Sequence, residues 1–252
     1  MMKNNIGIIL QARTGSSRMP SKVVLSFYKN KTILDIIIEK IKSKLNYSLI
    51  VATTDLIQDD LIEKIALKNN INCFRGDENN VLKRFIDCAE KYNFSTIVRV
   101  CSDNPFLDLE FLSNIIIEHL KSEVDYTSYC TKKNTPVIKT HYGVFCEVVE
   151  LNSLKKVLLE TNDSYYLEHV TNYIYGNPNS FKINLLPIPN YLENSNIRLT
   201  LDSKEDWDIL QDLYFKCIEN NTNFDTRSVL DILKDDAIKL NVMNSQIQKY
   251  SK

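Results

Sequence analysis

The sequence predicts an α/β protein built around a largely parallel β-sheet. Over the first half of the chain, short β-branched runs alternate with stretches of helical periodicity, which is the pattern of stacked β-α units. The 252 residues are 44% hydrophobic, which is enough to bury a substantial core. A folded protein with helices packed on a sheet is therefore expected.

In the first half of the chain, each expected strand is followed by a helix. The helices are inferred from apolar residues that recur at helical spacing, and Thr32 can cap the start of the first one. The expected strands cover 6–11, 48–53, 71–75 and 96–101, and the helices between them cover 33–45, 61–66 and 81–89.

The rhythm changes after about residue 125. Strands are expected at 125–129, 143–150, 181–188 and 196–202, and helices at 151–159, 164–175, 203–219 and 226–240. The sequence has no internal repeat, low-complexity tract or Gly/Ser linker. A single domain over 1–252 is therefore preferred to two independent ones, with a first half of about 1–124, an inserted or appended subregion of about 125–195 and a closing part of about 196–252.

Composition excludes several classes of protein. The formal net charge of −1 gives no general attraction to nucleic acid or acidic membranes, so any anion binding must come from a local cluster. The apolar runs are far too short to span a bilayer and no export signal opens the chain, which predicts a cytoplasmic protein. The six cysteines lack Cys-x-x-Cys spacing, so reduced, mostly buried thiols are expected rather than zinc ligands or disulfides.

A polar loop with three cations follows the first expected strand. In LQARTGSSRMPSK (10–22), Arg13, Arg18 and Lys22 are joined by Gly15, which permits a tight backbone path, and by two serines that offer hydroxyl and amide donors. Ligands of open parallel sheets bind beyond the carboxyl ends of the strands, so a phosphate-binding loop is predicted. The stretch matches neither GxxxxGK[ST] nor GxGxxG, and solvated loop cations are the alternative.

Two aspartates stand at the ends of strand-like runs. In VRVCSDNPFLD (98–108) a strand runs into Asp103 and is halted by Pro105, and in IRLTLDSKEDW (197–207) alternating residues lead to Asp202. A carboxylate beside bound phosphates requires a cation between them, and Mg²⁺ is normally held by one or two carboxylates plus phosphates. The pair predicts a Mg²⁺ site, whereas the alternative for Asp202 is that it only assists a helix cap at Ser203.

Taken together, these stretches resemble the spore-coat-polysaccharide type of cytidylyltransferase, a family related to the enzymes that make CMP-activated acidic sugars. The family pattern IQAR-GS-R-P-K is similar to LQARTGSSRMPSK. The similarity continues in order through VATTDLIQDDLI, CFRGDENNVLKRF, VRVCSDNPFLD, YLEHVTNYIY and IRLTLDSKEDW, over about residues 6–216. Ser102 and Asn104 depart from the usual neighbours of the aspartate, and Lys204 replaces a usual proline. These departures bear on substrate choice more than on reaction type, because every carboxylate and loop cation is kept.

The resemblance implies a Rossmann-like, glycosyltransferase-A-like three-layer sandwich, with nucleotide bound by the first half and the acceptor and a dimer contact in the 125–195 subregion. It implies attack of an acceptor hydroxyl or phosphate on the α-phosphorus of CTP, with Mg²⁺ as cofactor and release of pyrophosphate. The acceptor would be a sugar, acidic sugar or polyol-phosphate-like molecule for surface polysaccharide or glycan synthesis. A homodimer is expected by analogy, and neither nucleic acid nor membrane is an expected partner.

The resemblance also assigns residues. Arg13, Lys22, Asp103 and Asp202 would carry catalysis, and the two aspartates would ligate Mg²⁺. For Arg99 a structural ion pair on the sheet face is about as consistent with the pattern as a nucleotide contact, and Arg75 has similar standing. The residues that would contact the nucleotide are Gln11, Ala12 through its amides, Arg13, Gly15, Ser16, Ser17, Arg18, Lys22, Arg75 and Arg99. Those that would contact the acceptor are His141, Glu168 and His169, although the tyrosine-rich stretch around the last two is equally typical of core or a subunit contact.

Two other classes of function stay open at this point. A glycosyltransferase of the same fold would keep the aspartates and the metal but should lack the basic loop. A non-catalytic module that kept the fold has no need of both Asp103 and Asp202. The sequence therefore favours a nucleotidyltransferase.

Overall fold

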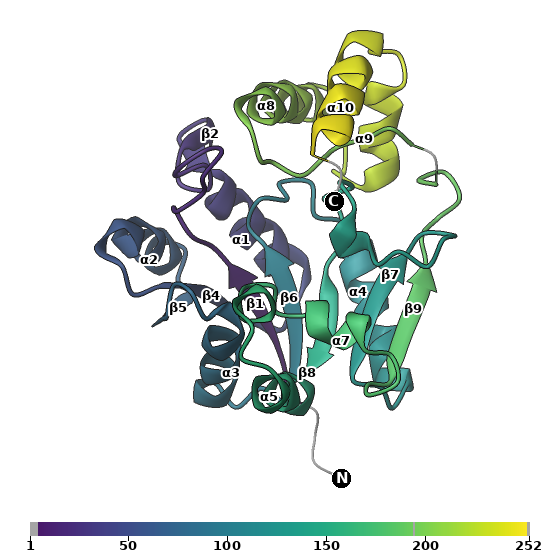
Figure 1. Ribbon diagram of the computed structural model, residues 1–252. Coiled ribbons are helices and arrows are strands. Elements are labelled where there is room, and N and C mark those ends of the chain that lie inside the picture. The colour runs from purple at the N-terminus through teal and green to yellow at the C-terminus, as the bar shows by residue number, and fades with distance from the viewer. Residues whose placement is uncertain (1–4, 194, 251–252) are drawn as a thin grey trace.

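The computed structural model describes residues 5–193 and 195–250, and the other residues of the predicted 1–252 domain lie outside this description. Within the described residues, seven strands form one sheet in the order β5-β4-β1-β6-β8-β7-β9 (Figure 1). β8 runs antiparallel to both of its neighbours, and the other adjacent pairs are parallel. The strands are β1 (Ile6–Gln11), β4 (Ser48–Thr54), β5 (Asn72–Gly76), β6 (Thr96–Cys101), β7 (Tyr126–Cys130), β8 (Glu147–Glu150) and β9 (Ile183–Pro187).

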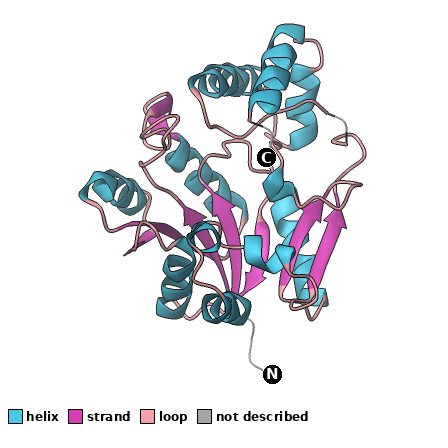
Figure 2. Ribbon diagram, in the orientation of Figure 1, coloured by secondary structure: helices cyan, strands magenta, loops and turns pink. Residues whose placement is uncertain are grey.

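Helices cover both faces of the sheet (Figure 2), because successive strand residues point to opposite faces. In β1, Ile8 and Leu10 belong to one hydrophobic cluster and Ile9 belongs to the other. This arrangement of helix, sheet and helix confirms the predicted α/β class with a mainly parallel sheet. The first cluster receives side chains from α1 (Ile33–Lys44), α2 (Asp60–Lys68), α4 (Leu109–Lys121), α8 (Lys204–Glu219), α9 (Thr226–Leu233) and α10 (Ala237–Lys249), and the second from α3 (Val81–Lys91), α5 (Leu151–Glu160), α6 (Ser164–Glu168) and α7 (Asn172–Gly176).

Local sequence signals explain where several helices begin. Thr32 and Asp35 form a capping box at the start of α1, and Ser203 and Asp206 form one at the start of α8. Two helices expected as single elements are each divided, at 169–171 between α6 and α7 and at 234–236 between α9 and α10. The second division occurs where the Asp236 side chain accepts a hydrogen bond from the Lys239 amide and starts a new helix.

Small elements near the first loop were not expected from the sequence. β2 (Ser26–Tyr28) and β3 (Lys31–Thr32) form a separate hairpin. Its turn places Lys29 and Asn30 at positive φ, as tight hairpin turns require. The part of the chain that the structure describes also contains two 3₁₀ turns, η1 (Ile57–Asp59) and η2 (Val137–Lys139).

The strand predicted at 196–202 is wrong. Residues 196–202 form no strand and belong to no sheet. The Leu199 amide donates to the His141 carbonyl at 3.0 Å and the Leu201 amide to the Asp103 carbonyl at 2.9 Å, so the segment is held between two loops. Gly143 lies so close that a Cβ on it would be 2.4 Å from the Leu199 carbonyl carbon. Apolar alternation reports an extended chain, whereas a strand also needs a neighbouring ladder.

Two further observations concern the chemistry of the chain. Within the described residues, no helix is long and apolar enough to cross a membrane. All six cysteines are free. Four of them are buried, and Cys73 and Cys101 are partly exposed.

Candidate active site

The buried carboxylate of Asp59 holds the loop after β1 in place. The Thr14 amide and hydroxyl both donate to Asp59 Oδ1, at 2.8 and 2.5 Å, and the Thr54 hydroxyl donates to the other oxygen. Burial acts to raise the pKa of Asp59, but these hydrogen bonds outweigh it and hold the pKa below its usual value. The Thr14 carbonyl in turn accepts the amides of Ser16 and Ser21 at 2.8 and 2.9 Å. The loop therefore has a fixed shape.

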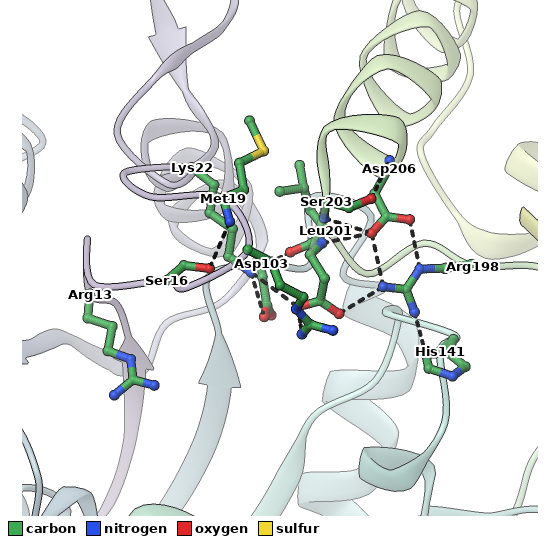
Figure 3. Close-up of polar contacts among 12 residues, drawn as sticks. Arg13, Ser16, Met19, Lys22, Asp103, His141, Arg198, Leu201, Ser203 and Asp206 are labelled. Atoms are coloured by element: carbon green, nitrogen blue, oxygen red, sulfur yellow. Dashed lines mark hydrogen bonds and ion pairs between the residues drawn. The ribbon is translucent and has the colours of Figure 1, made fainter. Parts of the chain in front are cut away.

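The two predicted aspartates meet at one lysine, and Figure 3 shows Lys22 beside Asp103 and Leu201. Lys22 Nζ lies 3.4 Å from Asp103 Oδ2 and 3.4 Å from Asp202 Oδ1, and it also donates to the Leu201 carbonyl. Only 7% of Lys22 is exposed, so it is not the solvated loop cation of the alternative interpretation. The loop between 196 and 202 lies on the Asp103 carbonyl, and this backbone contact brings the distant Asp202 to the end of β6.

A fully buried arginine, Arg198, binds the Asp202 oxygen that does not face Lys22. Arg198 Nη2 donates to Asp202 Oδ2 at 2.9 Å, and its Nε and Nη2 donate to the two Asp206 oxygens at 2.7 and 2.9 Å. Burial acts to lower the pKa of Arg198, but Asp206 and Asp202 reverse this effect and raise it. Because Arg18 Nη2 lies 2.9 Å from Asp202 Oδ1, the two oxygens of this carboxylate face different cations.

A pocket of about 670 Å³ opens over this cluster at the carboxyl ends of β1 and β6. It is the position at which open α/β sheets bind ligands. Its wall includes these residues predicted for the nucleotide, the metal or the acceptor: Gln11, Arg13, Ser16, Ser17, Arg18, Lys22, Arg99, Asp103, His169 and Asp202.

The floor of the pocket contains a second buried ion pair. Arg99 Nη1 donates to Glu147 Oε2 across the β6–β8 pairing, and Arg99 Nη2 donates to Gln11 Oε1 at 3.2 Å. Burial acts to lower the pKa of Arg99, and the nearby Cys101 and Glu147 together reverse this and raise it. Glu147 also accepts hydrogen bonds from the Tyr126 and Thr171 hydroxyls. Arg99 therefore forms the predicted sheet-face ion pair and lines the pocket as well.

The tyrosine-rich segment forms another side of the pocket. Glu168 Oε1 lies 3.0 Å from Arg13 Nη2, which joins α6 to the first loop. The His169 ring packs edge-on against Tyr165, with ring centroids 4.7 Å apart, and both residues line the pocket. Glu168 is not among the lining residues, so the structure brings it to the site through Arg13.

Four other predicted site residues lie off the pocket wall. The Ala12 amide, expected to meet the base, donates to the Ala52 carbonyl at 3.1 Å and so continues the sheet ladder. Gly15 is not at positive φ; Ser21, at φ 60, is the left-handed residue of this loop. Arg75 is bound at the far edge of the sheet by Asp60 Oδ1 and two backbone carbonyls.

His141 is the fourth predicted site residue that lies off the pocket wall. It is buried, and its Nδ1 accepts a hydrogen bond from Arg198 Nη1. A guanidinium only donates, so neutral His141 carries its proton on Nε2. The structure therefore places His141 against Arg198 and off the pocket wall.

Two residues of the site were not predicted from the sequence: Glu147 lines the pocket, and Arg198 holds Asp202 without lining it. Each is a charged residue within an otherwise apolar run and each is almost completely buried. A charge inside an apolar run was the signal that could have identified them. Lys139, Asn172 and Tyr175 also line the pocket, and nothing in their spacing distinguishes them from surface or core residues.

The carboxylates fit a metal ion only with further ligands. Within the described residues, no group of three or more His, Cys, Asp or Glu side chains is arranged to hold a metal. Asp103 and Asp202 nevertheless direct one oxygen each at the same ammonium. Two converging carboxylates match the oxygen donors of Mg²⁺, which completes its coordination with water and substrate phosphates.

Comparison with known proteins gives relatives of similar length. An uncharacterized protein of Methanocaldococcus jannaschii is 37% identical over 249 residues, covering 98% of this chain and 96% of the relative. The spore coat polysaccharide biosynthesis protein SpsF of Bacillus subtilis is 34% identical over 222 residues, covering 86% of this chain and 89% of the relative.

Solved structures show the same fold. A cytidylyltransferase from Leptospira borgpetersenii has a TM-score of 0.81 and 29% identity, covering 94% of this chain and 96% of that chain. A CMP:2-keto-3-deoxy-manno-octonic acid synthetase complexed with CTP has a TM-score of 0.64, with 84% of this chain and 99% of that chain covered, and its 11% identity supports the fold alone. The sequence model of the cytidylyltransferase family matches residues 7–246. Nearly the whole chain thus carries the family pattern, and this protein belongs to the cytidylyltransferase family of nucleotidyltransferases.

Proposed function

We propose that this enzyme transfers CMP from CTP to a sugar, acidic sugar or polyol-phosphate-like acceptor, with release of pyrophosphate, for surface polysaccharide or glycan synthesis. One observation carries the proposal: the three loop cations and the two aspartates share the pocket at the end of β1 and β6. The name of the Bacillus subtilis relative, which refers to spore coat polysaccharide biosynthesis, supports the biological setting.

The charge pattern supports a triphosphate as ligand. Each loop cation is paired with a carboxylate: Arg13 with Glu168, Arg18 with Asp202, and Lys22 with both aspartates. When a triphosphate binds, its oxygens can replace the carboxylates as partners of the arginines and the lysine. A divalent cation can then replace the arginines and the lysine as the partner of the carboxylates. The exchange keeps every buried charge compensated, which a charged site excluded from water requires.

In the proposed reaction, a bond forms between an acceptor oxygen and the α-phosphorus of CTP, and the bond from that phosphorus to the oxygen bridging to the β-phosphorus breaks. Arg13, Arg18 and Lys22 hold the triphosphate and stabilise the charge that develops on the departing pyrophosphate. Asp103 and Asp202 would hold Mg²⁺, which when bound supplies positive charge beside the phosphates. Positioning and charge stabilisation are the main demands of such a displacement.

Other lining residues are suited to a small polar acceptor. They include the Arg99–Glu147 pair, Lys139 and the Tyr165 and His169 rings. These groups can bind hydroxyl and acidic groups of a sugar.

A homodimer stays a prediction by analogy, and a mass measurement in solution at micromolar concentration tests it.

The deciding experiment measures pyrophosphate release. The enzyme is incubated with CTP, Mg²⁺ and a panel of neutral sugars, 2-keto acidic sugars and polyol phosphates, with an Asp103→Asn variant as control. Release that depends on CTP, on one acceptor class and on Asp103 is expected. Release from another nucleoside triphosphate in place of CTP would contradict the proposal, and so would consumption of a finished nucleotide sugar, which is the glycosyltransferase outcome.

A further inference from the structure

The last helix of the chain brings an aromatic residue to the nucleotide loop. α10 packs beside α8 and α9 (Figure 1), with Met243 buried in the main core. Tyr250 follows directly after this helix, and its amide donates to the Gln246 carbonyl at 3.0 Å. The Tyr250 ring centroid lies 4.8 Å from Arg18 Cζ and 5.5 Å from Arg198 Cζ. One ring therefore contacts a loop arginine and a buried arginine.

These two arginines are the ones that hold the two oxygens of Asp202. Arg18 Nη2 is 2.9 Å from Oδ1, and Arg198 Nη2 is 2.9 Å from Oδ2. The Tyr250 ring therefore contacts both of the arginines that bind the Asp202 carboxylate. Tyr250 itself is not a lining residue of the pocket, so it acts on the site only through the arginines.

The two arginines need this support to different degrees. The Arg198 side chain is completely buried, whereas the Arg18 side chain is 40% exposed. A long, exposed arginine loses rotamer freedom when it binds a phosphate. An aromatic face attracts the guanidinium and holds it in one position before the ligand arrives.

We propose that Tyr250 is a positioning residue for the triphosphate site, and that it acts by holding Arg18 in place beside Asp202. The proposal rests on the proposed function, because it takes the ligand of Arg18 to be the phosphates of CTP. It makes α10 a part of the nucleotide site, although the helix contributes no residue to the pocket wall.

The test compares two apolar replacements. Tyr250→Leu keeps an apolar side chain at the C-terminal end of α10 but removes the aromatic face, and Tyr250→Phe keeps both. Tyr191→Leu is the matched control, because the Tyr191 ring lies 5.0 Å from Arg227 Cζ and away from the pocket. The dissociation constant for CTP with Mg²⁺ is measured by calorimetry, together with the melting temperature of each variant. Tyr250→Leu should weaken binding about three- to tenfold, the range expected for one cation–aromatic contact. Tyr250→Phe and Tyr191→Leu should leave it unchanged.

A second set of variants ties the effect to Arg18. In an Arg18→Ala background, Tyr250→Leu should have no further effect on CTP binding. Equal binding by Tyr250→Leu and the wild type would overturn the inference, as would a lower melting temperature with unchanged binding, or losses that multiply with Arg18→Ala.

Inorganic tripolyphosphate with Mg²⁺ separates this inference from the proposed function. If the wild type binds tripolyphosphate but shows no preference for CTP over other nucleotides, the cytidylyl assignment is wrong. In that case the effect of Tyr250→Leu on tripolyphosphate binding still decides the role of Tyr250. Failure of the wild type to bind either ligand would overturn both.

Discussion

Asparagine substitutions of the two aspartates separate their chemical role from their structural role. Asp103→Asn and Asp202→Asn each keep the side-chain shape and remove one charge. If both carboxylates hold the same Mg²⁺ beside CTP, each substitution should lower turnover by about a hundredfold or more, the scale found when one electrostatic stabiliser is removed. The double variant should then fall well short of the product of the two losses, because the first substitution already disrupts the shared site.

The structure predicts unequal effects on stability. The Asp103 side chain is 31% exposed, and its ion pair is with Lys22 at 3.4 Å, so Asp103→Asn should change the free energy of unfolding by less than about 1 kcal/mol. The Asp202 side chain is 10% exposed and faces Arg18, Lys22 and the fully buried Arg198. Loss of its charge should destabilise the fold by about 2 to 3 kcal/mol, which is below the usual effect for a broken buried pair because Arg198 keeps Asp206.

Two measurements on the same protein preparations test this reasoning. Pyrophosphate release at saturating CTP and Mg²⁺ gives the turnover of the wild type, the two single variants and the double variant. Urea unfolding at neutral pH gives their stability. Losses of turnover that multiply would refute the shared metal. A less stable Asp202→Asn with normal turnover would reduce Asp202 to a structural residue.

CTP with Mg²⁺ should raise the melting temperature more than ATP, GTP or UTP, because ligands stabilise the state that they bind; equal shifts would remove the cytidine assignment. Lys22→Met, which keeps the buried stem, should weaken CTP binding at least about tenfold and also lower stability, since it leaves two facing carboxylates without their shared ammonium; unchanged calorimetric binding would contradict a phosphate role. The hydrogen-bonded Asp59 has a lowered pKa, so its stabilisation is present above about pH 4 and is lost as pH falls through the folded-state pKa; Asp59→Ala should therefore be less stable than the wild type at pH 7, and urea unfolding should show the gap narrowing in acid. Burial lowers the pKa of Lys40 to about 8, and the unfolded value is about 10.4, so the unfolded state binds more protons between these values and stability rises with pH there. Lys40→Met should raise stability at pH 7 and abolish that rise, and an unchanged pH profile in urea unfolding would show that Lys40 is not its source.

The sequence by itself determined the local features of this protein. Apolar periodicity predicted the strands β1, β4, β5 and β6 and the helices between them, because a repeat of two or of 3.6 residues is a property of neighbouring positions. Thr32 and Ser203 predicted helix starts, since a cap forms within four residues. The basic loop after the first strand was recognisable for the same reason, and the order of strands and helices placed it at the ligand-binding edge of the sheet.

Only the tertiary structure decided which of these residues meet. Lys22, Asp103 and Asp202 come from three loops, and their convergence depends on the 196–202 segment packing between two other loops, which alternation misidentified as a strand. Arg75 and Arg99 are both strand arginines, yet Arg75 is bound at the sheet edge by Asp60 and Arg99 forms the pocket floor. The difference lies in the position of each strand in the sheet, since β5 is an edge strand and β6 lies between β1 and β8. An arginine looks the same in the sequence whether its strand lies at the edge or inside the sheet. Its partner is fixed by long-range packing, which no local sequence pattern records.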